Sequence, residues 1–321
     1  MECAVSIYSS RETAEVLAQT IEFALRGMSG LSSVLDVIVN GNLNLARGLA
    51  ADARLCETAP RGVRIRVWNI TLGDKAFAWN EYVHRIAPTS RAYVFIDGYV
   101  RVDVGAIKHL THVLGQSDNA LAATGVPRVG LTARRVAKSL QRDGGMHGNL
   151  YALKACTVVE LRRIGFRLPL GIYRTDPTLG AALGFGLNLF EREWRPKERI
   201  VLDAAAGWDL TPLAWWRPRD LRTAYRRRQR QAQGLLENAA VRETYALRSL
   251  PFEQLPSTAA GLVEQWIEWV PAEALQLLSN NSLARKALAH LREPRDWSAH
   301  LEAPQLLLDQ LGTAPTGLDA T

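Results

Sequence analysis

The sequence has few cysteines and no long apolar run. Its three cysteines, Cys3, Cys56 and Cys156, lie far apart and form no paired motif. A disulfide framework and a zinc site are therefore not expected, and a reducing compartment is the natural environment. No stretch approaches the roughly 20 apolar residues of a membrane-spanning helix, and the first residues lack the basic start and apolar stretch of a signal peptide. We therefore expect a cytoplasmic protein, which could still lie against the inner face of a membrane.

Positive charge is in excess, and this excess is unevenly spread. The 321 residues carry a formal net charge of +7. Many arginines gather in one short segment: Arg217, Arg219, Arg222, Arg226, Arg227, Arg228 and Arg230. Such a segment can meet anionic lipid, nucleic acid or the phosphates of a small substrate, or it can be a solvated helix face. Because Tyr225 alone brings an aromatic ring among these arginines, we expect no nucleic-acid partner.

Strand-like and helix-like segments alternate along the first half of the chain. Apolar runs predict strands at residues 4–8, 35–39, 63–67 and 93–96. Helical periodicity predicts a helix that ends at Gly27 and further helices at residues 43–55, 75–86 and 104–114. Strands separated by helices predict an α/β fold, in which helices flank a mainly parallel sheet.

Two capping-box patterns predict where helices begin. Ser9 with Glu12, and Thr157 with Glu160, have the spacing at which two side chains satisfy free backbone N–H groups. The second of these helices is expected to end at Gly165.

The rest of the chain divides into an irregular middle and a helical tail. Residues 125–149 combine glycines and basic residues with little periodicity, which predicts an irregular or mobile loop. From Pro218 onward the pattern is helical. We therefore expect an α/β domain of residues 1–235 and a helical C-terminal extension of residues 236–321.

Ligands of an open parallel sheet bind beyond the carboxyl ends of its strands, so the loops there carry the functional motifs. In chain order, the segments of interest are Ser6–Thr13, Val37–Asn42, Gly73–Asn80, Tyr93–Tyr99, Gly148–Leu153, Thr175–Leu179 and Arg227–Gln231. By their order and spacing, these segments resemble the motifs of the family 2 glycosyltransferases of the GT-A fold. The resemblance covers roughly residues 4–235.

This resemblance implies a GT-A-like, Rossmann-related sheet domain and a sugar-transferring enzyme. The expected donor is a nucleotide diphosphate sugar, and the expected acceptor is a hydroxyl of a glycan, a lipid-linked saccharide or a protein. An inverting reaction in bacterial-type glycan or glycoconjugate synthesis is implied. The leaving diphosphate must be stabilised, the acceptor must lose a proton, and the two must be held in line.

Asp97 is the residue expected at the donor diphosphate. In the resembling family an aspartate at this place binds a divalent metal, Mg²⁺ or Mn²⁺, and carboxylate oxygens suit such cations. Here Tyr99 stands where the family usually has a second aspartate. A different interpretation is also open, because Asp97-Gly98 between two apolar segments is a typical hairpin turn.

Asp176 is the residue expected to act as the catalytic base. A carboxylate at this place can accept the proton of the acceptor hydroxyl if it lies within hydrogen-bond reach. The alternative is a helix N-cap before Pro177, where aspartate is common. The two interpretations are compatible.

The other residues expected at the donor come from several loops. The candidates are Tyr8, Ser10, Glu12, Asn40, Lys75, Asn80, Arg227 and Arg230. Lys75 suits phosphate, although a lysine there could simply be solvated. Asn80 could instead hold a neighbouring loop, and the arginines could form a surface that contacts an anionic membrane.

Two further sets of residues have weaker signals. His147 lies in a glycine-rich stretch and could approach the donor or a metal, although a lone loop histidine is often incidental. Trp208, Trp215 and Trp216 could stack on an acceptor sugar or belong to the core. The apolar tail could cover the domain or pair with a second subunit in a homo-oligomer.

Other functions remain possible at this point. A catalytically silent GT-A-fold protein could bind nucleotide sugars or act as a scaffold, which would explain Tyr99 and the missing acid at Asn40. A nucleotidyltransferase would need a glycine-rich loop after the first strand, and Tyr8–Arg11 has no glycine.

Overall fold

The structure is a computed structural model that describes residues 1–130, 132–210 and 218–314. Its described part is organised around a nine-stranded sheet with the strand order β5-β8-β6-β7-β4-β1-β2-β3-β9. The strands are β1 (Cys3–Ser9), β2 (Ser33–Asn40), β3 (Val63–Ile70), β4 (Ala92–Asp97), β5 (Arg101–Val102), β6 (Ala122–Pro127), β7 (Leu150–Lys154), β8 (Ile200–Asp209) and β9 (Gln305–Leu311).

The centre of the sheet is parallel. Strands β3, β2, β1 and β4 pair in parallel, and so do β6 and β8. Strand β7 runs antiparallel between β4 and β6, while β5 and β9 are antiparallel at the two edges. The α/β fold with a mainly parallel sheet, predicted from the sequence, is confirmed.

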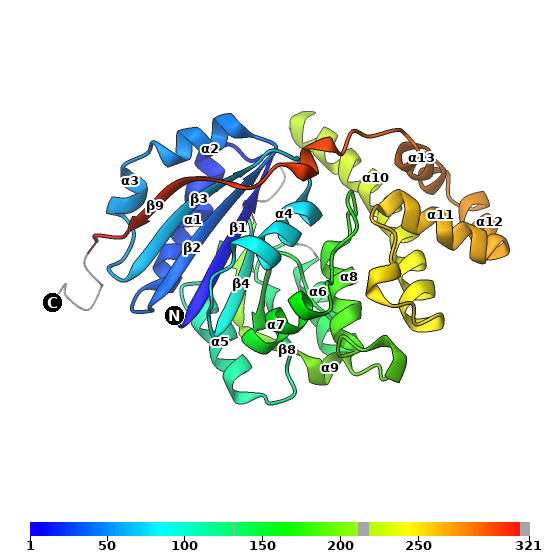
Figure 1. Cartoon of the computed structure of the whole chain (residues 1–321), viewed down its shortest axis with the longest axis horizontal. Coiled ribbons are helices and arrows are strands. Elements are labelled where there is room, and N and C mark those ends of the chain that lie inside the picture. The colour runs from blue at the N-terminus through cyan, green and yellow to red at the C-terminus, as the bar shows by residue number, and fades with distance from the viewer. Residues whose placement is uncertain (131, 211–217, 315–321) are drawn as a thin grey trace.

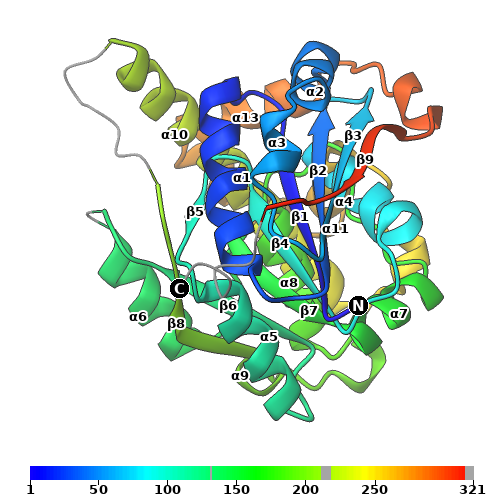
Figure 2. The same cartoon turned by 90° about the vertical axis from the view of Figure 1, so that its left-hand side faces the viewer.

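Helices cover both faces of this sheet (Figures 1 and 2). One face carries α1 (Ala14–Met28), α2 (Leu43–Ala50), α3 (Arg54–Glu57) and α5 (Ala106–Gln116). The other carries α4 (Lys75–Glu81), a π-helical turn (Tyr82–Ile86), α7 (Ala155–Arg163) and α8 (Thr175–Gly184).

Alternating side chains of the buried strands supply both cores. In β1, Val5 and Ile7 pack toward α1, whereas Ala4 and Tyr8 pack toward α4. This alternation follows from the two-residue period of a strand. Because β1 is buried on both faces, it appears in the sequence as a continuous apolar run.

The middle segment is more regular than expected. Residues 125–149 contain the end of β6 and an eleven-residue helix, α6 (Ala133–Asp143). The prediction of an irregular loop was therefore wrong. Ala133, Val136, Ala137 and Leu140 do recur at helical spacing, but α6 fully buries Ala133 alone, and the glycines and basic residues around this short pattern obscured it.

The prediction of two capping boxes was wrong, because neither pair of residues caps the start of a helix. Helix α1 begins at Ala14 with Thr13 as its N-cap, while Glu12 folds back onto the loop. Helix α7 begins at Ala155, so Thr157 lies inside it and its Oγ1 donates to the carbonyl oxygen of Leu121. In each case the side-chain oxygens form hydrogen bonds with groups of a nearby loop or strand. A local sequence pattern does not reveal such contacts.

Two helix boundaries also differ from those expected. The predicted helix at residues 43–55 is two helices, because α2 ends at Ala50 and α3 begins at Arg54. Helix α8 begins at Thr175 with Arg174 at the N-cap position, so Asp176 is in the first turn instead of capping it.

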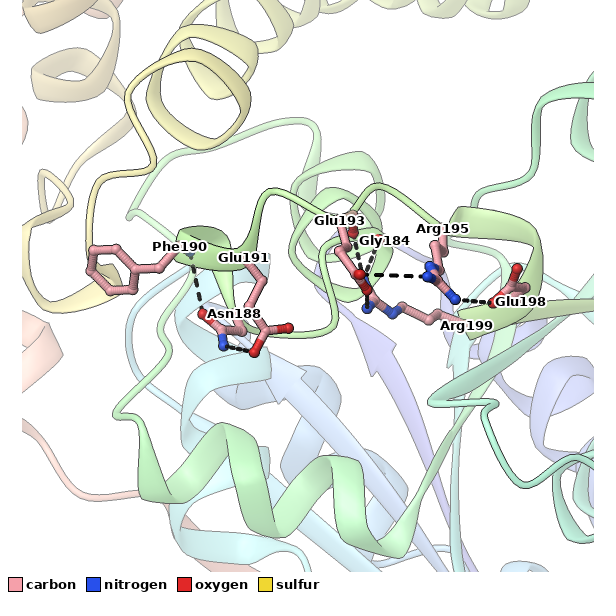
Figure 3. Close-up of polar contacts among 8 residues, drawn as sticks. All are labelled: Gly184, Asn188, Phe190, Glu191, Glu193, Arg195, Glu198 and Arg199. Carbon is pink, nitrogen blue, oxygen red and sulfur yellow. Dashed lines mark hydrogen bonds and ion pairs between the residues drawn. The ribbon is translucent and has the colours of Figure 1, made fainter.

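A polar network holds the connection between α8 and β8 (Figure 3). This connection contains a 3₁₀ turn (Leu189–Glu191) and α9 (Pro196–Arg199). Arg199 Nη1 donates to the carbonyl oxygens of Gly184 and Glu193, at 2.9 and 2.6 Å. These bonds satisfy backbone groups where no regular element can do so.

The C-terminal extension is helical, as expected, but it ends in a strand. It comprises α10 (Pro218–Val241), a π-helix (Arg242–Leu247), a 3₁₀ turn (Phe252–Gln254), α11 (Ala259–Trp269), α12 (Pro271–Ser279), α13 (Ser282–Leu291) and a second 3₁₀ turn (Ser298–Leu301). The chain then returns to the β3 edge as β9 (Figure 1). The predicted domain boundary at residue 235 falls inside α10.

The extension shares one hydrophobic core with the sheet. Leu236, Tyr245 and Trp266 are buried in the same cluster as Phe95 of β4. No helix among the described residues is both long and apolar enough to cross a membrane.

Candidate functional site

The candidate site lies where β1, β2, β3 and β4 end together. Tyr8 and Asp97 are register neighbours on β1 and β4. The Gly98 N–H donates to the carbonyl oxygen of Tyr8 at 2.7 Å, and a Cβ on Gly98 would lie only 2.7 Å from that oxygen. The chain therefore needs glycine immediately after Asp97.

The hairpin interpretation of Asp97-Gly98 was wrong. Strand β4 pairs with β1 and β7, and the short strand β5 that follows pairs with β8 instead. The turn after Asp97 therefore leads the chain away from β4. The carboxylate of Asp97 lies at the carboxyl end of this central strand.

Both carboxylate oxygens of Asp97 have partners. Oδ1 forms an ion pair with Lys75 Nζ at the start of α4. Oδ2 accepts a hydrogen bond from the Tyr99 hydroxyl at 3.0 Å. The Tyr99 hydroxyl also lies 3.4 Å from Asn149 Oδ1. Tyr99, at the place of the expected second aspartate, is therefore a hydrogen-bond donor to the first.

Several negative charges act on Lys75. Burial alone would lower the pKa of Lys75, but Asp97, and after it Asp176 and Glu12, raise that pKa above its usual value. Lys75 therefore remains a cation. Asp97 at the end of β4, Asp176 in the first turn of α8 and Glu12 in the loop after β1 therefore lie in the neighbourhood of one ammonium group.

Asp176 contacts the glycine-rich stretch before β7. Its Oδ2 accepts a hydrogen bond from the Gly148 N–H at 3.0 Å. A Cβ on Gly148 would lie 3.0 Å from the Asp176 carboxyl carbon, so glycine permits this close approach. Among the described residues Oδ1 of Asp176 has no hydrogen-bond partner, which leaves it able to accept a proton.

His147 faces the same group of charges. Burial lowers its pKa, Asp176 and Asp97 raise it, and Lys75 and Arg227 lower it, with a net decrease. Its Nδ1 accepts a hydrogen bond from the Asn149 N–H at 3.2 Å. The neutral ring therefore carries its proton on Nε2. The signal for His147 in the sequence is weak, because no local pattern indicates which residues lie near it.

The ring of His147 packs against Trp208 of β8, with centroids 4.8 Å apart. Trp208 is buried, which fits the packing alternative for this residue. Trp215 and Trp216 lie outside the described residues, as do the side chains of Arg219 and Arg222 and all of Arg217.

The first loop is built around Glu12. Its Oε2 accepts hydrogen bonds from Ser9 Oγ at 2.8 Å and from the Ser10 N–H at 2.7 Å. Asn42 Nδ2 donates to the carbonyl oxygen of Ser10 at 3.3 Å. Ser10 and Glu12 thus shape the loop above β1, near the Lys75 ammonium.

Tyr8 lies beneath this loop. It is buried, stacked on Phe95 and edge-on to Tyr82, with ring centroids 6.3 and 6.2 Å away. Its hydroxyl has no partner among the described residues, and burial raises its pKa well above the usual value.

The side-chain amides of two asparagines form hydrogen bonds that hold loops in place. Asn40 is buried at the end of β2, and its amide is placed to donate to the carbonyl oxygen of Ser9 and to accept from the Asp74 N–H. Asn80 Nδ2 donates to the carbonyl oxygen of Leu168 at 2.9 Å, and its Oδ1 accepts from the Leu168 N–H at 2.8 Å. The loop-holding alternative for Asn80 matches this geometry.

Asp74 fixes the start of α4. Its Oδ1 accepts from the Phe77 N–H at 2.8 Å, so Asp74 is the N-cap, and its Oδ2 accepts from the Gly171 N–H at 3.0 Å. Asp74 therefore links the helix that carries Lys75 to the loop that leads into α8 and Asp176.

The arginines of α10 reach this region from the other side. The Arg230 guanidinium lies over the ring of Tyr173, 5.6 Å from its centroid. Tyr173 in turn is close enough to Tyr99 to contribute to its raised pKa, although Asp97 has the largest influence. Arg227 influences His147. The two predicted arginines therefore face the loops that hold Asp97 and Asp176.

The donor set around Asp97 does not fit a divalent metal. No group of three His, Cys, Asp or Glu side chains that could hold an ion occurs in the part of the chain that the structure describes. A cation at Asp97 would have to displace either the Lys75 ammonium or the Tyr99 hydroxyl.

Sequence comparisons give no match, and structural comparisons give a distant likeness. No protein-family model matches the chain, and no curated protein matches it. A solved mannosyltransferase from Pyrobaculum calidifontis, in complex with GDP-Man and Mn²⁺, is 14% identical; the match covers 90% of this chain and 83% of that one, with a TM-score of 0.49.

Two other solved structures are similar at the same level. Residues 1–349 of S. aureus TarS, in complex with UDP-GlcNAc, are 10% identical, with 91% of this chain and 91% of that one covered and a TM-score of 0.46. Glucosyl-3-phosphoglycerate synthase from Mycobacterium tuberculosis, in complex with Mn²⁺, UDP-Glc and glycerol 3-phosphate, is 18% identical, with 71% of this chain and 78% of that chain covered and a TM-score of 0.43. These likenesses concern the fold, so we infer function from this chain's own residues.

Proposed function

We propose that the protein is a glycosyltransferase that moves a sugar from a nucleotide diphosphate sugar to an acceptor hydroxyl. The observation that carries this proposal is the meeting of Lys75, Asp97 and Asp176 at the carboxyl ends of the central strands. A fixed cation near a carboxylate that is held through one oxygen provides for the two charge changes of the reaction. The donor loop around Ser10 and Glu12 lies next to them.

The proposed reaction is a single displacement with inversion. The acceptor oxygen forms a bond to the anomeric carbon while the bond from that carbon to the diphosphate oxygen breaks. The acceptor proton goes to Oδ1 of Asp176, whose Oδ2 is held by the Gly148 N–H. The departing diphosphate takes the electron pair, and positive groups of the site stabilise it.

Positive and polar groups surround the proposed leaving group. Lys75 is one positive group, and α10 adds Arg227, whose charge acts on His147, and Arg230, whose guanidinium lies over Tyr173. The Nε2–H of neutral His147 can donate a hydrogen bond in the same region. Asn40, Asn80 and Tyr8 then have the supporting task of fixing the loops and the strand end.

The acceptor is proposed to approach through a neighbouring cavity of about 340 Å³. This cavity lies between the loop before α8 and helices α10, α11 and α13, and its lining includes Gly171, Arg295 and Trp297. Gly171 bonds to Asp74, next to Lys75. An aromatic face with polar groups at its edge is suited to a saccharide.

The proposal is tested first by donor binding. We expect one class among GDP-Man, UDP-Glc and UDP-GlcNAc to raise the melting temperature of the pure protein, because a ligand at 100 times its Kd adds about 2.7 kcal/mol to the free energy of unfolding. The same donor should then be transferred to a glycan or lipid-linked acceptor.

The role of Asp176 is tested by an isosteric change. Asp176→Asn should leave donor binding in place and lower the transfer rate by about 10²- to 10⁴-fold, because the base is lost. Asp118→Asn, at an exposed position on the other side of the fold, is the matched control. An unchanged rate in Asp176→Asn would remove this residue from the mechanism. A wild-type protein that binds donor but neither transfers nor hydrolyses it would instead be the silent binding protein.

A further inference from the structure

Lys75 occupies the position at which an exogenous cation would be expected. Its ammonium is paired with Asp97 Oδ1, and Asp176 and Glu12 are the next negative groups that act on it. Three carboxylates, from the end of β4, the first turn of α8 and the loop after β1, thus act on a cation that belongs to the chain itself. A buried or half-buried set of like charges is stable only when an opposite charge lies among them.

Tyr99 completes this arrangement. Its hydroxyl donates to the second oxygen of Asp97, so the carboxylate has an ammonium on one side and a phenol on the other. A phenol donates a hydrogen bond to a carboxylate, whereas a second aspartate there would add negative charge and favour a divalent ion. The phenol in place of a carboxylate and the nearby Lys75 ammonium therefore both reduce the negative charge that would favour a divalent ion.

The side chain of Lys75 is partly exposed to solvent. The side chain of Lys75 is 39% exposed, whereas that of Asp97 is 9% exposed. An ammonium has three N–H donors, and among the described residues the one hydrogen bond from Nζ goes to Asp97. Two donors are therefore free to face an incoming phosphate. A lysine that served only to neutralise Asp97 would not need this exposure.

We propose that Lys75 takes the place of the divalent cation, so that this protein binds and activates the donor diphosphate without a metal. This inference rests on the proposed function and specifies how the leaving group is stabilised. Upon donor binding, Nζ stays on Asp97 Oδ1 and directs its other N–H groups to the diphosphate oxygens. Arg227 and Arg230 supply the remaining positive charge from α10.

The test is the binding of UDP and of GDP to the full chain, measured by calorimetry in EDTA and in Mn²⁺. We expect the preferred nucleotide to bind with the same affinity, within about twofold, in both solutions. Lys75→Met should lower the affinity by about tenfold or more, because it removes a charge-assisted hydrogen bond to phosphate. Lys75→Arg keeps the charge and should recover part of the loss.

Controls separate this inference from the proposed function. Lys108→Met removes an exposed lysine on α5 and should bind as the wild type does. The wild-type comparison of EDTA with Mn²⁺ needs no variant, so it remains decisive if Lys75→Met folds poorly. Binding that requires Mn²⁺, or that survives in Lys75→Met, would overturn the metal-free role and leave the glycosyltransferase intact. Absence of nucleotide binding in both solutions would overturn both.

Discussion

His84, in the π-helical turn after α4, is a half-buried neutral group whose protonation would oppose folding. Its Nε2 lies 2.7 Å from the carbonyl oxygen of Phe166. Burial lowers its pKa, the hydrogen bond to Phe166 raises it, and the charges of Arg167 and Arg162 lower it, with a net decrease from 6.5. The folded protein therefore disfavours protonation of this ring.

Stability is consequently expected to fall in weakly acidic solution. In the unfolded chain His84 takes up a proton below about pH 6.5, whereas in the folded protein it does so only at lower pH. The free energy of unfolding should therefore decrease as pH falls from about 6.5 through the folded-state pKa, and level off below it. Urea unfolding at a series of pH values measures this slope.

His84→Gln should flatten that slope, and His112→Gln, at an exposed position on α5, should not. The pKa of His147 is also lowered, so part of the dependence is expected to persist in His84→Gln. A slope identical to that of the wild type would show that His84 is not a source of it.

Individual residues of the proposed site were easier to predict from the sequence than the contacts between them. Asp97, Lys75 and Asp176 were predicted from motif order, and the charges of Asp97 and Asp176 both act on Lys75. The ion pair between Lys75 and Asp97 joins residues 22 positions apart, so it depends on which strands are neighbours. The tasks of Asn40 and Glu12 are likewise set by contacts with loops that no local pattern specifies.

Elements were predictable where burial imposes a period. Strands β1, β2 and β4 are buried along their length and appear as apolar runs. Strands β8 and β9 have mixed exposure, so no regular alternation identifies them, and the apolar period of helix α6 is short and lies among basic residues. Strand β9 in particular exists because β3 offers an open edge, which is a property of the assembled sheet.

Two substitutions in β9 test whether this strand docks on the edge of β3 with one side buried. Leu308 pairs with Val67 and packs against the core beneath α2, whereas Leu306 is 45% exposed. Leu308→Asp should lower the free energy of unfolding by about 1 to 3 kcal/mol, because it places a charge against an apolar core.

Leu306→Asp makes the same chemical change on the exposed side and should stay within about 0.5 kcal/mol of the wild type. Thermal or urea unfolding measures both. Equal effects of the two substitutions would mean that β9 does not dock as a strand with one buried side.

At the scale of the whole molecule, the helical extension and the sheet form one body around a shared core. The segment between α13 and β9 brings Arg295 and Trp297 against Gly171, where a Cβ would lie 3.2 Å from the Trp297 ring. The extension thus reaches the loop that is anchored to Asp74, beside Lys75. We expect it to influence which acceptor is used more than how the donor is bound.

Trp297→Ala should therefore raise the KM for the acceptor by about threefold to tenfold, since an aromatic contact contributes about 0.5 to 1.5 kcal/mol. Nucleotide affinity should stay within about twofold of the wild type. Trp194→Ala, at a half-exposed tryptophan on the α8–β8 connection, is the control. An effect on nucleotide affinity alone would place Trp297 on the donor side instead.

The return of the chain to β3 also has a consequence for synthesis on the ribosome. Arg64 of β3 pairs with Asp309 of β9, which follows 245 residues later. Until that segment emerges, a nascent chain keeps one side of its first parallel strands open, with backbone groups that can pair with another chain. Stalled or prematurely terminated products that lack β9 are therefore expected to aggregate, and to need chaperones more than the full-length protein does.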